Sequence, residues 1–343
     1  MKAKILLLFI LIIAANCSVE AQKNSACAEF QKLIDATYNF KPSKLTASEQ
    51  TAKSAAMDKV WEKVKTNQKE FLPCLREAIN SPTADNFFKF DAGNLLFSLD
   101  PTDETKKTLI KAYAGVDFGD IDLRYWMPNI ARLGFENFDV SAAGESWLKY
   151  PNPKYYLPPH GTLEVNKEIG ALIIYGSMDE SIATPALVKI ASQENNPARE
   201  IAVRILMRQA TPEAFRELKK LDQKNLSENT RQNINALLTK PNLLAAREGK
   251  PKVTRQEYLD AFQKLVDGKP NTFLDLTIKV PDGEKDAIAV MKPEDVPLIR
   301  KARRYFAATA NPHSPEWYKS FTDILMALTG KPEIIEQKAK GNL

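Results

Sequence analysis

The chain has 343 residues and a formal net charge of +5, with 48 Lys and Arg residues interleaved with 43 Asp and Glu residues along its length. This balance argues against nucleic acid as the main partner, because proteins that bind nucleic acid gather basic residues in a patch. Beyond the N-terminus no apolar stretch approaches the roughly 18 to 20 residues that a membrane span needs, so we expect no membrane span.

The first 21 residues predict a secretory signal peptide. Lys2 and Lys4 precede an unbroken apolar run from Ile5 to Ala15, and Val19-Glu20-Ala21 offers a cleavage site before Gln22. Such a signal directs the mature chain out of the cytosol, so we expect a secreted or periplasmic protein.

Cys17 leaves a second route open. If a lipoprotein peptidase cut before Cys17, the chain would be anchored to a membrane by lipid. Asn16 stands where such a peptidase usually meets a small residue, which favours cleavage after Ala21.

Two cysteines remain after the signal, Cys27 and Cys74. In a compartment that oxidises thiols they predict one disulfide, with two free buried thiols as the alternative. Closing a loop of this length would restrict the unfolded chain by ~4 kcal/mol in the chain-entropy picture.

The mature chain is poor in glycine, and its apolar residues recur at helical spacing, a pattern typical of an all-α protein. The clearest unit is a hairpin of two helices from Ile182 to Gln209. Asn195-Asn196-Pro197 separates the two helices, because proline is tolerated in the first turn of a helix but not in its middle. Amphipathic helices joined in this way bury their stripes against each other and against a neighbouring pair.

Three further pairs of helices are predicted, which together indicate an array. They are Asn86–Leu99 with Glu104–Tyr113, Pro212–Leu221 with Glu228–Leu238, and Val296–Ala308 with Glu316–Leu328.

The segment from Asn196 to Leu206 resembles the turn and second helix of a HEAT repeat. In that family an Asp-Pro or similar turn precedes a helix with an early Arg and small residues on its packed face, which Arg199 and Ala202 match. The resemblance implies a right-handed α-solenoid of HEAT-like or armadillo-like hairpins with a concave surface. It implies an architecture and no activity or cofactor.

Proline and glycine between residues 240 and 251 predict a boundary after the central array. The expected organisation is a signal at 1–21, an N-terminal helical cap at 22–84, a HEAT-like array at 85–240, a C-terminal helical unit at 241–330 and a tail at 331–343.

One segment has the alternation of a strand. Leu274, Leu276, Ile278 and Val280 alternate with polar residues. They predict a short β-hairpin within 274–291 whose second strand is Ala287–Met291, with a short helix as the alternative.

Aromatic residues around a proline-rich segment form the best candidate contact surface. Pro151–Pro159 holds too many prolines for a helix. Rigid aromatic side chains lose little entropy on binding, although here they could instead form a lid over the helices. The candidate binding residues are Trp147, Tyr150, Tyr155 and Tyr156.

The segment from Asp117 to Trp126 carries the most concentrated carboxylates, at Asp117, Asp120 and Asp122, next to aromatic residues. A glycosidase needs paired carboxylates beside rings that stack on sugar, so this segment could be the active loop of a hydrolase acting on polysaccharide or peptide. The simpler interpretation is a loop whose Asp residues cap the next helix.

No other chemistry has a recognisable pattern. His160 and His313 are the only histidines, and no spacing typical of a zinc site surrounds them, so no metal site or cofactor is predicted. The densest basic cluster predicts a solvated helix edge paired with Glu294 and Asp295, with an anion site as the alternative. Its members are Arg300, Lys301, Arg303 and Arg304.

These patterns favour an exported, non-catalytic helical repeat protein that binds a protein or peptide partner in the cell envelope. The alternative is an exported hydrolase acting through residues 117–126, and a third hypothesis is a structural envelope component with no discrete ligand.

Overall fold

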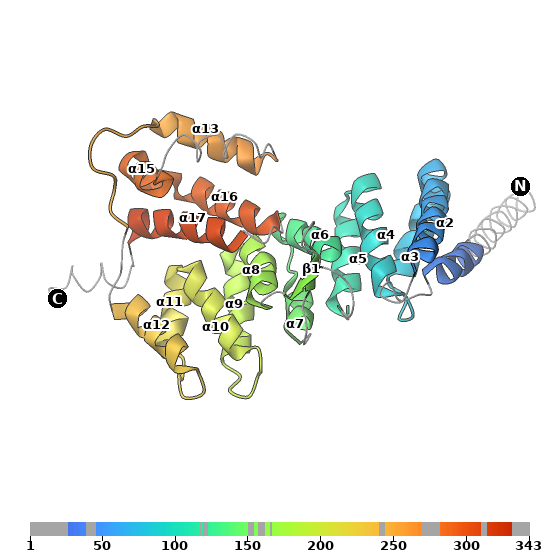
Figure 1. The fold of residues 1–343 in the computed structure, drawn as a ribbon, viewed down its shortest axis with the longest axis horizontal. Helices are drawn as coiled ribbons and strands as arrows, with labels where there is room; N and C mark the ends of the chain where they lie inside the picture. The colour runs from blue at the N-terminus through green and yellow to red at the C-terminus, as the bar shows by residue number, and fades with distance from the viewer. Residues whose placement is uncertain are drawn as a thin grey trace, which may run out of the picture. The chain divides into compact units, whose positions relative to one another are not determined.

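The computed structural model describes residues 27–38, 46–116, 118, 123–149, 154–156, 162–164, 167–239, 244–268, 282–309 and 314–330. These residues are almost entirely helical, as predicted, with one short two-stranded sheet (Figure 1). The chain divides into two compact units, residues 1–121 (unit 1) and 122–343 (unit 2). No helix in the described ranges has both the length and the apolar character of a membrane span. The predicted signal, Cys17 and the tail lie outside them.

The helices of unit 1 begin where the sequence provides capping side chains. Thr46 and Glu49 form a reciprocal capping box, and Asp85 and Thr102 each accept a hydrogen bond from a backbone amide of the next helix, which otherwise has no partner. The helices are residues 27–38, α2 (Ala47–Thr66), α3 (Gln68–Ile79), α4 (Asn86–Leu99) and α5 (Asp103–Ala114).

Aromatic rings fill the core of unit 1. Phe30 lies 5.2 Å from Phe71 between ring centroids, and Tyr38 lies 5.8 Å from Trp61 and 5.1 Å from Phe88. All five side chains are buried. Packing of such rings stabilises the helices beyond the area that they bury.

A carboxylate lies beside this cluster. Oδ2 of Asp91 accepts hydrogen bonds from the Tyr38 hydroxyl at 2.6 Å and from the Trp61 indole nitrogen at 2.8 Å. Burial raises the pKa of the Asp91 carboxyl, and the two donors oppose that rise only in part. The ionised form of Asp91 is therefore less favourable here than in water.

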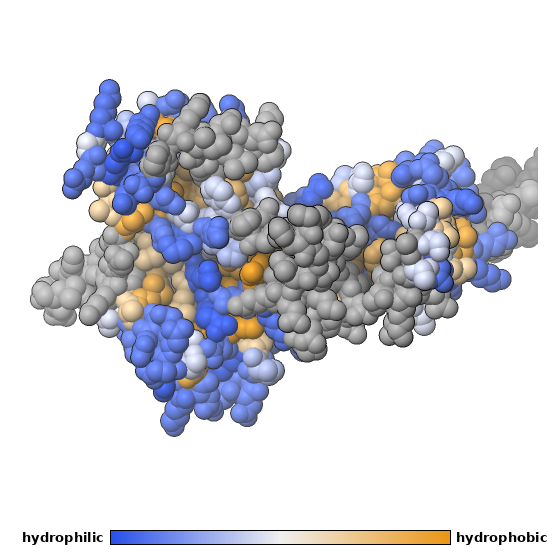
Figure 2. Space-filling view, viewed as in Figure 1, coloured by the Kyte–Doolittle hydropathy of each residue, from blue (hydrophilic) through white to orange (hydrophobic). Residues whose placement is uncertain are grey.

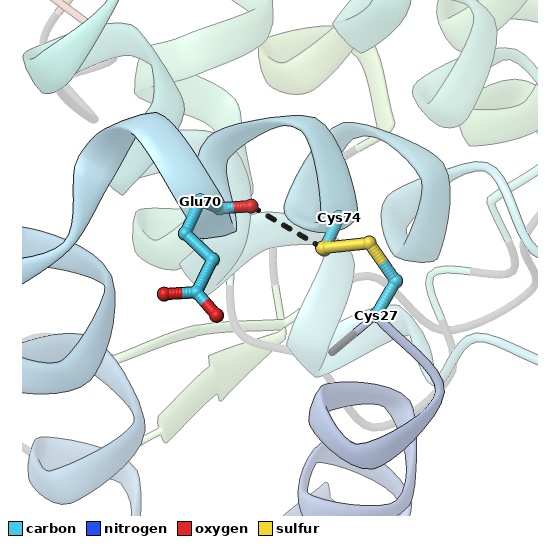
Figure 3. Close-up of a disulfide and its surroundings, with 3 residues drawn as sticks. All are labelled: Cys27, Glu70 and Cys74. Atoms are coloured by element: carbon cyan, nitrogen blue, oxygen red, sulfur yellow. Dashed lines mark hydrogen bonds between the residues drawn. A yellow bond between two sulfur atoms is a disulfide. The ribbon is translucent and has the colours of Figure 1, made fainter. Parts of the chain in front are cut away.

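The predicted disulfide is confirmed. Cys27 is bonded to Cys74 with their Cα atoms 5.0 Å apart (Figure 3). The bond joins the helix at 27–38 to the buried face of α3, where Sγ of Cys74 lies 3.4 Å from the carbonyl oxygen of Glu70 one turn earlier. It therefore links two elements that also meet through Phe30 and Phe71.

Unit 2 contains the sheet and the remaining helices. The sheet pairs β1 (Lys154–Tyr156) with β2 (Thr162–Glu164) in antiparallel register. The helices are α6 (Leu123–Phe135), α7 (Ser141–Lys149), α8 (Lys167–Ser177), α9 (Glu180–Ala191), α10 (Arg199–Gln209), α11 (Pro212–Lys220), α12 (Glu228–Thr239), α13 (Arg255–Val266), α15 (Gly283–Val290), α16 (Val296–Ala308) and α17 (Ser314–Thr329), with a 3-10 turn at Pro293–Asp295 before α16.

Helix α8 is the centre of unit 2. Every residue from Gly170 to Ser177 is buried, because the segment is apolar on all sides and packs against α6, α7, α9, α10, α16 and α17. A helix without a polar face is stable only when other helices surround it.

The two helices of the predicted Ile182–Gln209 hairpin are present and pack together as α9 and α10. Buried Arg199 fixes the turn, since its Nε donates to the carbonyl of Ala191 at 2.9 Å and its Nη2 donates to that of Asp222. The helices of the other predicted pairs are also present, at α4 with α5, α11 with α12, and α16 with α17.

The strand predicted at Ala287–Met291 is wrong. Residues 287–290 belong to α15, whose buried residue Ala287 joins a cluster formed by α13, α15, α16 and α17. An apolar run this short is compatible with either a strand or a helix. Here it forms a helix, because its apolar residues pack against the other three helices. Residues 274–280 lie outside the described ranges.

Candidate binding groove

Trp147 is not part of an exposed surface, so its prediction as a binding residue is wrong. The side chain is 1% exposed, and its indole nitrogen donates to the carbonyl of Lys167 at 2.9 Å. The ring lies directly over Gly170 of α8, where an added Cβ would overlap it. Trp147 therefore joins α7 to α8 as a core residue.

The role of the three predicted tyrosines as contact residues stays a prediction. Tyr155 and Tyr156 lie in β1, where they pair with Leu163 and Thr162, and the proline-rich segment is not helical there. Their side chains, and all of Tyr150, lie outside the described structure.

The acidic segment from Asp117 to Trp126 also remains a prediction. Asp117, Asp120 and Asp122 lie outside the described residues, as do the side chains of Arg124 to Trp126. Phe118 is described and is buried, with its ring 6.2 Å from that of Phe90.

Neither histidine is described, and within the described ranges no three His, Cys, Asp or Glu side chains come together as metal ligands would.

Two members of the predicted basic edge are buried instead of solvated. Arg303 is 1% exposed and Arg304 is 7% exposed. Glu294 and Asp295, the predicted partners of the cluster, instead accept hydrogen bonds from Arg255 at 3.0 and 2.6 Å. The prediction was wrong because α16 turns these two arginines toward α8 and α9, which lie far away in the sequence.

Arg304 joins the ends of three helices. Its Nε donates to the carbonyl of Ser177 at the end of α8, and its Nη2 donates to the carbonyl of Phe135 at the end of α6, both at 2.9 Å. The same Nη2 lies 2.8 Å from Oδ1 of Asn137, and Nη1 lies 3.3 Å from Oδ2 of Asp179, which caps α9. One cation thus satisfies carbonyl groups that the ends of α6 and α8 leave without partners.

Arg303 makes the corresponding links toward α10 and α17. It donates to the carbonyl of Gln209, to the hydroxyl of Thr322 and to Oε1 of Glu180, at 2.9, 2.8 and 2.6 Å. Its guanidinium carbon lies 4.7 Å from the centre of the Tyr318 ring. Tyr318 and Thr322 also line a groove on the adjoining surface.

This groove lies where α10, α12 and α17 meet, and its volume is about 520 Å³. We call it the α10–α12–α17 groove. Its lining is mainly apolar, with polar groups at intervals. The lining residues are Met207, Arg208, Asn233, Ala236, Leu237, Tyr318, Lys319, Thr322, Asp323 and Met326.

Figure 2 shows one face of the molecule, on which apolar surface is visible in unit 2 between the hydrophilic outer faces of α13 and α12. The volume of the groove and its mainly apolar lining fall within the range of small ligand sites.

Comparison with known proteins adds no assignment. The chain matches no known protein family, and neither a characterised protein nor a solved structure is significantly similar to it. A function must therefore be argued from the groove itself.

One wall of the groove carries a fixed charge network. Glu168 accepts hydrogen bonds from Nε of Arg204 at 2.7 Å and from Nε of Arg208 at 2.8 Å. Arg204 also donates to Glu200 at 3.0 Å. The Ser227 hydroxyl, donating to Glu200, is the largest cause that lowers the pKa of that carboxyl. These contacts tie α10 to α8 and to the start of α12, and they hold Arg208 in place at the groove.

Sequence reasoning did not find the groove. Met207, Leu237 and Met326 belong to three helices and lie at ordinary helical positions, so no local pattern marks them as a shared surface. The available signal was the pair Arg204 and Arg208, one turn apart on α10, where two cations on one helix face require anionic partners from elsewhere.

Proposed function

We propose that the mature protein is an exported, non-catalytic helical repeat protein whose α10–α12–α17 groove binds a peptide segment of a protein partner. The observation that carries the proposal is the lining of the groove, in which apolar side chains from three helices face one space of about 520 Å³. Such a space suits the apolar side chains of a short segment.

Two methionines support this choice of ligand. Met207 and Met326 lie on separate walls of the groove. Methionine is flexible and polarisable, so it adapts to different apolar side chains and is frequent on surfaces that bind peptides. Tyr318 borders the same space as a buried side chain, 2% exposed.

Export is supported by the signal-like N-terminus and by the Cys27–Cys74 disulfide. Disulfides form and persist in oxidising compartments and are rare in the cytosol. A HEAT-like right-handed array remains part of the proposal, supported by consecutive helical pairs and by the buried Arg199 at the turn of the α9–α10 hairpin.

A groove-filling variant tests this function. Ala236 lines the groove on α12, whereas the neighbouring Asn235 is exposed and does not line it. Tagged wild-type protein, Ala236→Trp and Asn235→Trp are used to capture proteins from an envelope extract of the source cells. Circular dichroism first establishes that the three proteins fold alike.

We expect the wild-type and Asn235→Trp proteins to retain the same partner. Ala236→Trp should bind this partner about tenfold more weakly, which corresponds to a loss of ~1.4 kcal/mol in binding free energy. Equal recovery with Ala236→Trp would show that the partner binds elsewhere and would remove the groove from the proposal.

A further inference from the structure

Arg208 lines the groove, and only part of its guanidinium group is hydrogen-bonded to other described residues. The Nε of Arg208 donates to Glu168 at 2.8 Å, and the side chain is 40% exposed. Among the described residues its two terminal nitrogens, Nη1 and Nη2, donate no hydrogen bond. These two nitrogens present the planar fork that binds both oxygens of a carboxylate.

Arg204, one turn earlier on α10, differs from Arg208 in its hydrogen bonds. Arg204 donates to Glu168 through Nε and to Glu200 through Nη1, so it is engaged on two sides and does not line the groove. Glu168, with a side chain only 12% exposed, fixes the direction of both arginines. Arg208 is therefore oriented before a ligand binds, which lowers the entropic cost of binding.

The other charges that line the groove neutralise each other. Lys319 and Asp323 lie one turn apart on α17 and pair at 2.5 Å. Lys319 offsets the repulsion that Asp323 would exert on an incoming carboxylate. Arg208 is thus the charged group in the lining best suited to select the charge of a ligand.

The walls also restrict the conformation of the ligand. They are formed by α10, α12 and α17, whose interior backbone groups are bonded within each helix, so an extended segment would find no free strand edge to pair with. A helical segment satisfies its own backbone and presents apolar side chains along one face.

Resting on the proposed function, we infer that the ligand is an amphipathic helix of a partner protein that presents a Glu or Asp carboxylate to Arg208. Its apolar residues, three and four positions apart, face Met207, Leu237 and Met326. The carboxylate accepts hydrogen bonds from Nη1 and Nη2 of Arg208, while Nε stays on Glu168.

A displayed library of 16-residue helical peptides serves as the probe. The library is selected on the wild-type protein and counter-selected on Ala236→Trp, so that the surviving peptides require the groove. The strongest binder, labelled with fluorescein, is then measured by anisotropy beside a version in which each Glu becomes Gln and each Asp becomes Asn.

The decisive measurement is a double-mutant cycle. We expect the loss of the peptide carboxylates to weaken binding to wild-type protein about tenfold and to have little effect on binding to Arg208→Gln. Arg216→Gln is the matched control, because Arg216 is exposed on α11 and does not line the groove. If Arg208→Gln does not fold, Arg208→Lys replaces it, since lysine keeps the charge without the fork and should recover only part of the preference.

The remaining outcomes distinguish a failure of this inference from a failure of the proposed function. Peptides that require the groove but bind equally well without their carboxylates would overturn this inference and leave the proposed function standing. Groove-dependent peptides that tolerate a central proline would overturn the helical conformation in the same way. Failure to select any peptide on wild-type protein over Ala236→Trp would overturn the proposed function as well.

Discussion

Replacing Arg304 with alanine should destabilise unit 2 substantially. The substitution removes the donors to Ser177 at the end of α8 and to Phe135 at the end of α6. Gly134 loses a hydrogen bond as well, but its carbonyl keeps the one from the backbone amide of Asn137. The main loss is therefore the buried carbonyl of Ser177.

The magnitude follows from these contacts. A buried carbonyl left without a donor costs ~1–3 kcal/mol. The guanidinium also lies 5.7 Å from the centre of the Phe135 ring, a cation–π contact that contributes ~0.5–2 kcal/mol. We therefore expect Arg304→Ala to lower the free energy of unfolding by ~2–5 kcal/mol.

Urea unfolding of the disulfide-bonded protein, followed by circular dichroism, measures this change. Lys301→Ala is the control, because Lys301 lies on the same helix but is exposed, and it should change stability by no more than ~0.5 kcal/mol. Equal stabilities for Arg304→Ala and Lys301→Ala would refute the assignment of Arg304 as the residue that joins α6, α8 and α9.

Two further predictions concern unit 1. Replacing both Cys27 and Cys74 with serine should lower the free energy of unfolding by ~4 kcal/mol, which is measured by urea unfolding as a lower midpoint. Adding reductant should then leave the stability of the variant unchanged. Because the pKa of Asp91 is raised in the folded state, its contribution to stability is fully present below the unfolded pKa of about 3.9 and is lost as pH rises through the folded value. Asp91→Asn should keep an oxygen acceptor for Tyr38 and Trp61, so the stability of the variant relative to wild type should increase from pH 4 to pH 7. A constant difference across that range would contradict the raised pKa.

The helices could be predicted because their signals are local. The predicted bounds of Asn86–Leu99 and Val296–Ala308 are those of α4 and α16. Asp85 caps the first helix, and a proline stands in the first turn of the second. Such caps and prolines act within one turn, so they can be read without knowing the rest of the fold.

The groove and the buried arginines could not be predicted, because they depend on distant contacts. Arg303 and Arg304 look like a charged surface in sequence, yet their partners Glu180 and Ser177 lie 123 and 127 residues away. Trp147 was misplaced for the same reason, since Gly170 leaves the space for its ring only after α7 and α8 have packed. Composition cannot distinguish an aromatic surface from an aromatic core.

The bonds of Arg303 and Arg304 also imply that unit 2 should survive being cut in two. Glu248 is exposed between α12 and α13, and α16 follows it in the chain. A protein nicked by a glutamate-specific protease between Glu248 and Gly249 should remain a complex of two fragments, because the bonds from α16 to Ser177, Glu180 and Gln209 cross the cut. The C-terminal fragment would then act as a tight ligand of the other, and expressing the two separately would allow their reassembly to be followed by complementation.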